Sequence, residues 1–278
     1  MADQVLTVGG SNSAIVPEVW SSMFQTEFND SIVFPSIVRR DYEGEIANQG
    51  DTVHIPSIAD VEASELLDGG RNDAITITAT VDDLVVDLIA AVDYKVSTLA
   101  DLQSIPFVNE LRARGSSAIL RKIQDKMISR VAPSTSAPDH VIAYDSSTTL
   151  ADADLLEAFD LEATANWARS NDKYLVTGEL QYNDLTSISK FYDKTLSGVA
   201  GVEQGKMLAP IYGHNVSSST ACGTTTYLFE GSFMQAAIGG LNVKVTDLAV
   251  LGERGYRLNM DVIYGIKQVH NDRVITIG

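Results

Sequence analysis

The residues best suited to metal chemistry are scattered along the sequence rather than grouped. Zinc sites usually combine histidines and cysteines that lie a few residues apart. The chain has one cysteine, Cys222, and no histidine has another histidine or a cysteine three or four residues away. The spacing therefore predicts no metal site, and isolated strand or loop residues are the simpler interpretation of the four histidines, His54, His140, His214 and His270.

Three further patterns resemble catalytic motifs without completing them. Residues 201–206 resemble a phosphate loop, but Met207 stands where Ser or Thr would hold the metal, and the glycines are one residue too close. Asp82 and Asp83 begin a predicted strand. The acidic pair at 152 and 154 opens a predicted helix, where the helix dipole favours carboxylates. We therefore predict that the protein is not an enzyme and binds no cofactor.

The composition limits the partners that the chain can hold. It has 278 residues, of which 45% are hydrophobic and 21% are charged, as in ordinary globular proteins. The formal net charge is -17, whereas strong nucleic-acid binding needs cations that neutralise phosphates. This charge argues against a dedicated nucleic-acid binder, although an acidic protein can enclose DNA without binding it specifically.

Nothing in the sequence predicts a membrane or secreted protein. No apolar run approaches the roughly 18 residues that a membrane span requires. The first residues, Met-Ala-Asp-Gln, lack the basic and apolar regions of a signal peptide. A single cysteine cannot form an intrachain disulfide, in keeping with a reducing cytosol. We expect a cytosolic chain with no membrane contact.

A long hairpin is predicted near the amino end. Apolar and polar residues alternate at 52–55 and again at 74–81, and the glycines and short polar residues between them favour turns. We expect residues 43–81 to form this hairpin. Residues 1–42 would precede it as an arm with a short helix from Pro17, closed near Pro35. A two-stranded hairpin alone is marginally stable in water, so it needs a partner outside itself.

Charge gives the hairpin region a second property. Residues 41–73 contain nine acidic residues and one base, a net charge of -8. Two interpretations stay open, a solvated loop or a surface that contacts a neighbouring copy. On the second, the candidate contacts in this region are Glu43, Glu45, Asp68, Gly69, Gly70 and Arg71.

A long helix is predicted at 106–131. Leu111, Ile119, Ile123 and Met127 recur at multiples of four residues, which places them on one face. The helix is the basic part of the chain, and its basic face is either solvated or docks on acidic surface of another copy. The candidate intersubunit contacts on it are Arg112, Arg114, Arg121 and Lys122.

The remainder of the chain mixes helices and strands, so we predict an α+β fold. The expected elements are a buried strand at 84–92, a helix at 150–169 capped by Thr149, a strand at 174–177 that leads through Gly178 into a helix at 179–190, a loop at 197–226, an apolar helix at 233–238, and strands at 243–245, 257–269 and 274–277.

Several segments, taken in order, resemble one known family. Pro17-Glu-Val-Trp20, Arg40-Asp-Tyr-Glu-Gly-Glu-Ile46 and Gly50-Asp-Thr-Val-His-Ile-Pro56 are similar to the amino-terminal arm and extended loop of tailed-bacteriophage major capsid proteins with the Hong Kong 97-type fold. Further similar segments follow in the same order over almost the whole chain. They are Tyr174-Leu-Val-Thr177, Leu180-Gln-Tyr-Asn-Asp-Leu185, Ile211-Tyr-Gly-His-Asn-Val-Ser217, Arg254-Gly-Tyr256 and Tyr264-Gly265.

The resemblance implies a subunit of an icosahedral shell that assembles from hexamers and pentamers and encloses double-stranded DNA. It implies an arm at 1–42, an extended loop at 43–81, a peripheral domain at 82–144 with a spine helix at 106–131, an axial domain at 145–250, and a return to the peripheral sheet at 251–278. Some family members crosslink through a lysine of the extended loop. The first lysine here is Lys95, so this loop cannot supply that lysine.

The resemblance also implies partners and a location. We expect a separate scaffolding protein, a portal and possible decoration proteins, with the subunit in the virion capsid and, during assembly, in the host bacterial cytoplasm. Two alternatives stay open. One is the shell of an encapsulin-like compartment, and the other, from a different class, is a cytosolic α+β enzyme or carbohydrate-binding module.

Overall fold

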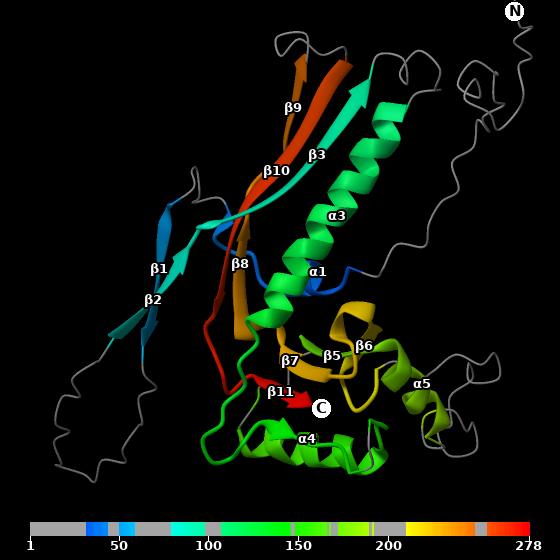
Figure 1. Ribbon diagram of the computed structural model, residues 1–278. Coiled ribbons are helices and arrows are strands. Elements are labelled where there is room, and N and C mark those ends of the chain that lie inside the picture. The colour runs from blue at the N-terminus through cyan, green and yellow to red at the C-terminus, as the bar shows by residue number, and fades with distance from the viewer. Residues whose placement is uncertain are drawn as a thin grey trace, which may run out of the picture.

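The computed structural model describes residues 32–43, 50–58, 79–97, 107–145, 148–165, 167, 172–188, 191, 210–247 and 255–278. Figure 1 shows an elongated upper part, built from one long helix and a sheet, above a compact lower unit, with a two-stranded ribbon leaving the side. The expected α+β class is confirmed by this mixture of helices and three sheets. The helix predicted from Pro17 and the tip of the predicted hairpin lie outside the described residues.

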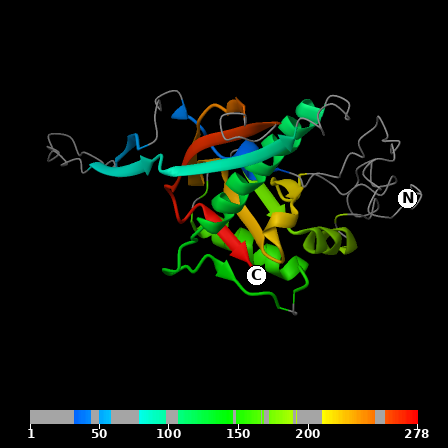
Figure 2. The same cartoon turned by 45° about the horizontal axis from the view of Figure 1, so that its top comes forward.

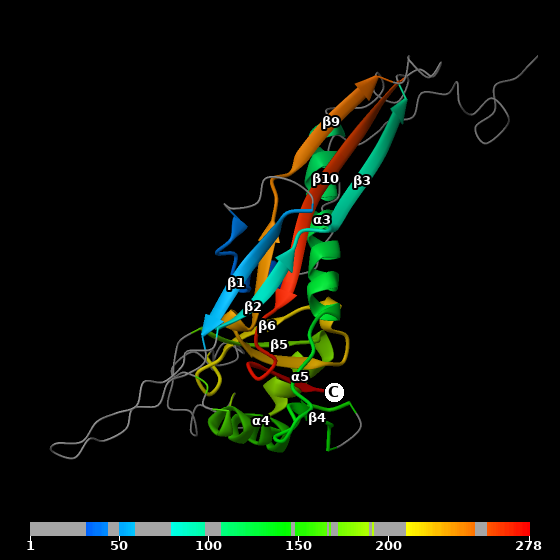
Figure 3. The same ribbon diagram turned by 90° about the vertical axis from the view of Figure 1, so that its left-hand side faces the viewer.

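The long helix α3 (Phe107–Ser129) forms where the sequence predicted it. Its four apolar residues at multiples of four, Leu111, Ile119, Ile123 and Met127, are all buried. They pack on strands β3 (Leu88–Ser97) and β10 (Gly255–Gln268), as Figure 3 shows with the helix behind the sheet. Gly115 permits this close packing, because a Cβ there would lie 2.7 Å from Sδ of Met260.

The upper sheet is organised around β10, as predicted for the segment 257–269. Strand β3 pairs with one edge of β10, while β9 (Asn242–Asp247) and β8 (Met234–Ile238) pair with the other edge, one after the other. Figure 2 shows β3 and β10 crossing over α3. The predicted helix at 233–238 is wrong. Its apolar run is a buried strand, an ambiguity that periodicity cannot resolve in so short a segment.

The lower sheet has the order β4-β11-β7-β5-β6, and its inner strands contribute to a hydrophobic cluster on each face. The central strand β7 (Thr226–Glu230) is buried at every residue. Leu228 points into a cluster with α4 and α5, whereas Phe229 points into a cluster with α3 and α1 (Phe34–Ile37). The other strands are β4 (Val141–Ile142), β5 (Lys173–Thr177), β6 (Asn215–Ser218) and β11 (Val274–Ile277).

The helices of the lower unit differ in part from expectation. The strand-to-helix step through Gly178 is confirmed as β5 followed by α5 (Glu179–Ser187). Helix α4 (Asp152–Thr164) is shorter than the predicted 150–169, and Thr149 is not its cap. The cap residue is Ala151, whose backbone N–H donates to the buried Asp154 carboxylate at 2.9 Å.

Three other expectations are corrected. Pro35 does not close the amino-terminal region but lies in the first turn of α1, where proline is well tolerated. The strand predicted at 84–92 is divided between β2 (Ala79–Val85) and β3, and only one of its faces is buried. The predicted loop at 197–226 contains β6 and a short 3-10 helix at Thr220–Cys222.

Candidate functional site

The ribbon of β1 (Thr52–Ile58) and β2 confirms that a hairpin forms in this region. The strands pair antiparallel from Thr52 opposite Val85 to Ile58 opposite Ala79. Two more backbone hydrogen bonds, from Gly50 to Val86 at 2.8 Å and from Val86 to Asp51 at 3.0 Å, extend the pairing at its base. The second strand therefore ends beyond the predicted limit of residue 81.

The two faces of this ribbon differ in burial. Val53, Ile55 and Leu84 form a small core with Ala237 of β8, so one face of the ribbon packs against the upper sheet. The opposite face carries Val81 and Val85, which are 58% and 41% exposed. Exposed apolar side chains beside an open strand edge are typical of surfaces that bind another chain.

A glycine lets the ribbon cross the upper sheet. A Cβ on Gly265 of β10 would lie 2.5 Å from the carbonyl oxygen of Val85 and 3.1 Å from Cα of Val86. Backbone atoms cannot move aside as a side-chain end can, so this crossing requires glycine. An ion pair between Lys267 and Asp82, 3.4 Å apart, lies at the same crossing.

Most of the predicted hairpin contacts lie outside the described residues. Glu43 is described, and it contacts its own chain. Its Oε1 accepts from the backbone N–H of Ile238 at 3.3 Å and lies 3.6 Å from Nη1 of Arg40. The candidates outside the described residues are Glu45, Asp68, Gly69, Gly70 and Arg71.

The four basic candidates all lie on α3, but they are not equivalent. The exposed residues Arg121 and Lys122 make no ion pair with any residue that the structure describes. Arg114 is half-buried and has a contact within the chain. The side chain of Arg112 is not described. Among the described candidates, Arg121 and Lys122 are therefore two charges on the exposed face of α3. Glu43, in contrast, is held by contacts within its own subunit.

A fully buried glutamine on α3 joins three parts of the chain. Oε1 of Gln124 accepts from the backbone N–H of Val33 at 2.7 Å, and Nε2 donates to Oγ of Ser219 at 2.9 Å. Val33 precedes α1, and Ser219 follows β6. Sequence reasoning missed this residue, because a glutamine beside an apolar stripe carries no signal that it is buried.

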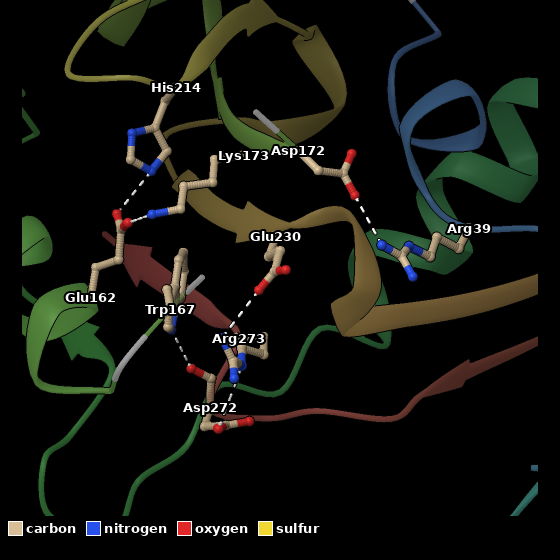
Figure 4. Close-up of polar contacts among 9 residues, drawn as sticks. All are labelled: Arg39, Glu162, Trp167, Asp172, Lys173, His214, Glu230, Asp272 and Arg273. Carbon is tan, nitrogen blue, oxygen red and sulfur yellow. Dashed lines mark hydrogen bonds and ion pairs between the residues drawn. The ribbon is translucent and has the colours of Figure 1, made fainter. Parts of the chain in front are cut away.

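A buried polar cluster lies in the lower unit and was also missed (Figure 4). Glu162 of α4 accepts a hydrogen bond from Nζ of Lys173 at the start of β5. Nε2 of His214 lies 3.0 Å from the other oxygen of Glu162, although the two atoms lack hydrogen-bond alignment. The three residues are 9%, 8% and 1% exposed.

Burial sets the charge state of this cluster. The pKa of His214 is lowered from 6.5 to about 4, chiefly by burial and secondly by the positive charge of Lys173. Burial also lowers the pKa of Lys173, while the carboxylate of Glu230 opposes that change. With a neutral His214, the ion pair of Glu162 and Lys173 leaves the cluster without net charge at neutral pH.

Neighbouring contacts fix the end of the lower sheet. Nη1 of Arg273 lies 3.2 Å from Oε2 of Glu230, and Nε1 of Trp167 donates to the backbone carbonyl of Asp272 at 2.7 Å (Figure 4). Arg39 pairs with Asp172 at 3.4 Å, but both side chains are more than a third exposed, so this pair adds little stability. These contacts order the chain that enters β11.

The polar contacts described above join separate parts of the fold to one another. No group of three histidine, cysteine or acidic side chains gathers as metal ligands among the described residues. Likewise, no helix in the described part of the chain is long and apolar enough to cross a membrane. What the structure does present is an open ribbon, a partly charged helix face and internal polar contacts that tie its parts together.

No protein-family model matches the chain, and no curated protein matches it. Solved structures do. A chain from Mycobacterium phage Che8 has a TM-score of 0.74 and 21% identity, covering 95% of this chain and 97% of its own. The capsid structure of cyanophage P-SCSP1u has a TM-score of 0.74 and 13% identity, covering 97% and 94%. The mature capsid of bacteriophage PhiM1 has a TM-score of 0.67 and 14% identity, covering 99% and 96%.

The chain has the fold of phage capsid proteins. The expected resemblance is thus confirmed at the level of the fold, and it extends over nearly the full length of both chains. Tyr264-Gly265 is one of the segments on which the resemblance to phage capsid proteins was based in the sequence. The structure supplies the physical reason for its glycine, the close crossing of the ribbon over β10.

Proposed function

We propose that this protein is the major capsid protein of a tailed bacteriophage and assembles into the icosahedral shell around its double-stranded DNA. The supporting observation is the match of nearly the whole chain to phage capsid chains, with at least 94% of each chain covered in the three comparisons. The acidic composition suits a shell that contains DNA without adhering to it. The location would be the virion capsid and, before assembly is complete, the host cytoplasm.

In this proposal the parts of the chain take the roles of a Hong Kong 97-type subunit. Residues 1–42 are the arm, 43–81 the extended loop, 82–144 the peripheral domain with its spine helix, 145–250 the axial domain, and 251–278 the return to the peripheral sheet. The open ribbon of β1 and β2 supports the second assignment, since its exposed face needs a partner.

The contacts between subunits would be many and individually weak. The candidate contacts remain those predicted from the sequence. They are Glu43, Glu45, Asp68, Gly69, Gly70 and Arg71 on the loop side, and Arg112, Arg114, Arg121 and Lys122 on α3. Such charges set register more than they add affinity, and repeated modest interfaces give a shell its stability by multivalency. A separate scaffolding protein, a portal and decoration proteins are the further partners that we propose.

Assembly of the purified protein tests the function. Size exclusion with light scattering and electron microscopy should detect shells, hexamers or pentamers, either from the protein alone or after co-expression with the scaffolding protein of its genome. A chain that stays monomeric with that scaffold would contradict the proposal.

Deleting residues 66–73 tests the extended loop separately. The ribbon residues that pack on β8, Val53, Ile55 and Leu84, are all kept in this deletion, so the subunit should fold while assembly is lost. A matched control is Lys244→Gln on the exposed strand β9, which should assemble normally. Normal shells from the deletion would overturn the assigned role of the loop.

A further inference from the structure

A tight turn with an unusual backbone lies between β5 and β6 in the lower unit. Ile211 and His214 exchange two backbone hydrogen bonds of 3.0 and 2.8 Å, which close a two-residue turn. Its central residues Tyr212 and Gly213 have φ angles of 48° and 87°. Both lie in the left-handed region, as in a type I′ turn. Glycine adopts this backbone freely, but tyrosine does so only when its surroundings hold it there.

Two sets of contacts hold the turn against α4. The ring of Phe159 on α4 lies 4.8 Å from the ring of Tyr212 and 5.1 Å from that of His214, and Phe191 contacts Tyr212 from another side at 5.7 Å. The second set is polar: Nε2 of the buried His214 lies 3.0 Å from an oxygen of Glu162, without hydrogen-bond alignment, beside the ion pair of Glu162 with Lys173. His214 therefore belongs to both sets.

The charged groups around His214 come from α4, β5 and β7 and from the residue before β11. Glu162 of α4 and Lys173 of β5 face its ring directly. Behind Lys173 lie Glu230 of β7 and Arg273 before β11, which form their own ion pair. Asp152 of α4 lies 3.4 Å from the hydroxyl of Tyr212, on the exposed side of the turn. No described group facing the ring offers a second carboxylate to balance a proton on His214.

We propose that Glu162, Lys173 and His214 form an acid-sensitive latch that holds the turn at 211–214 against α4. With His214 neutral, the buried ion pair is balanced and the turn is closed. A proton on His214 leaves one uncompensated positive charge in a site less than a tenth exposed. Opening hydrates the ring, and it also allows Tyr212 to leave its left-handed backbone.

The direction and size of the effect follow from the pKa of His214. An opened turn would have the ordinary pKa of 6.5, whereas the closed turn has a pKa of about 4. The open form therefore binds more protons between these values, so closure is complete above pH 6.5 and is lost progressively toward pH 4. Between pH 7.5 and 5 the ratio of closed to open turn should fall about 30-fold.

Hydrogen exchange of the full chain tests the latch in the isolated subunit, separately from shell assembly. After correction for intrinsic exchange rates, the backbone N–H groups of Ile211 and His214 should lose about 30-fold protection between pH 7.5 and 5. His214→Gln should abolish this pH dependence, because an amide does not titrate. His270→Gln, at an exposed histidine, should keep it.

Equal pH dependence in the wild type and His214→Gln would overturn the latch. A measurement on the wild type alone covers the case in which that variant does not fold. Ring nitrogen NMR should find His214 neutral at pH 6 and protonated only as the turn opens. A His214 ring that is protonated at pH 6 while the turn stays closed would equally overturn it.

Discussion

The polar junction at Gln124 makes the sharpest quantitative prediction. Replacing Gln124 with methionine keeps the side chain's approximate volume and its helix propensity while removing both hydrogen bonds. The backbone N–H of Val33 is then left buried without its acceptor, which costs about 1–3 kcal/mol. Loss of the bond to Ser219 adds roughly 0.5–1.5 kcal/mol, since that hydroxyl keeps a contact with the N–H of Ala221.

The expected total is a loss of about 2–4 kcal/mol in the free energy of unfolding. Urea denaturation of the unassembled subunit, followed by circular dichroism, measures this loss directly. The matched control is Lys122→Met, which places the same residue on the exposed face of the same helix and should change stability by less than about 0.5 kcal/mol.

If Gln124→Met and Lys122→Met were equally stable, the reasoning about the junction would be refuted. A second variant separates the two bonds. Ser219→Ala removes the bond from Gln124 and the 3.4 Å contact with the N–H of Ala221, but it keeps the acceptor of the Val33 N–H, so it should cost less than Gln124→Met. The opposite order would show that the N–H of Val33 does not depend on Gln124.

Two other substitutions test packing and buried charge. Gly265→Ala places a Cβ 2.5 Å from the carbonyl of Val85, so it should shift the ribbon base and destabilise the subunit by about 1–3 kcal/mol in urea denaturation. Gly240→Ala, with no atom within 4 Å of the new Cβ, is its neutral control, and equal effects would contradict the crossing. Lys173→Met leaves Glu162 buried without its cation and should cost about 3–5 kcal/mol. The double variant with Glu162→Gln should recover most of this loss, and no recovery would contradict the ion pair.

Local patterns predicted the elements whose burial repeats regularly along the chain. Helix α3 was predicted to within two residues, because its apolar residues keep helical spacing over five turns and all face one sheet. The strand β1 and the long strand β10 were also predictable from the sequence, since alternation or long apolar runs mark them. The prediction for segment 233–238 was wrong, because a run of six residues of which five are apolar fits a helix and a buried strand alike until the pairing of β8 with β10 decides.

The functional contacts were much less predictable than the elements. From the sequence, His214 was predicted to be an isolated histidine, because Glu162 and Lys173 lie 52 and 41 residues away from it along the chain. Gln124 likewise gave no signal, since its partners Val33 and Ser219 are 91 and 95 residues away. Local spacing carries no information on contacts between elements that meet only after the lower sheet has formed.

The sequence by itself determined the α+β class, the long helix, the hairpin and the likeness to phage capsid proteins, because these follow from periodicity and from short segments in fixed order. The tertiary structure alone decided which polar residues are buried and what they touch. Desolvation and hydrogen bonding depend on atoms brought together across the fold. For that reason the pKa of His214, the junction at Gln124 and the crossing at Gly265 became visible only in the folded chain.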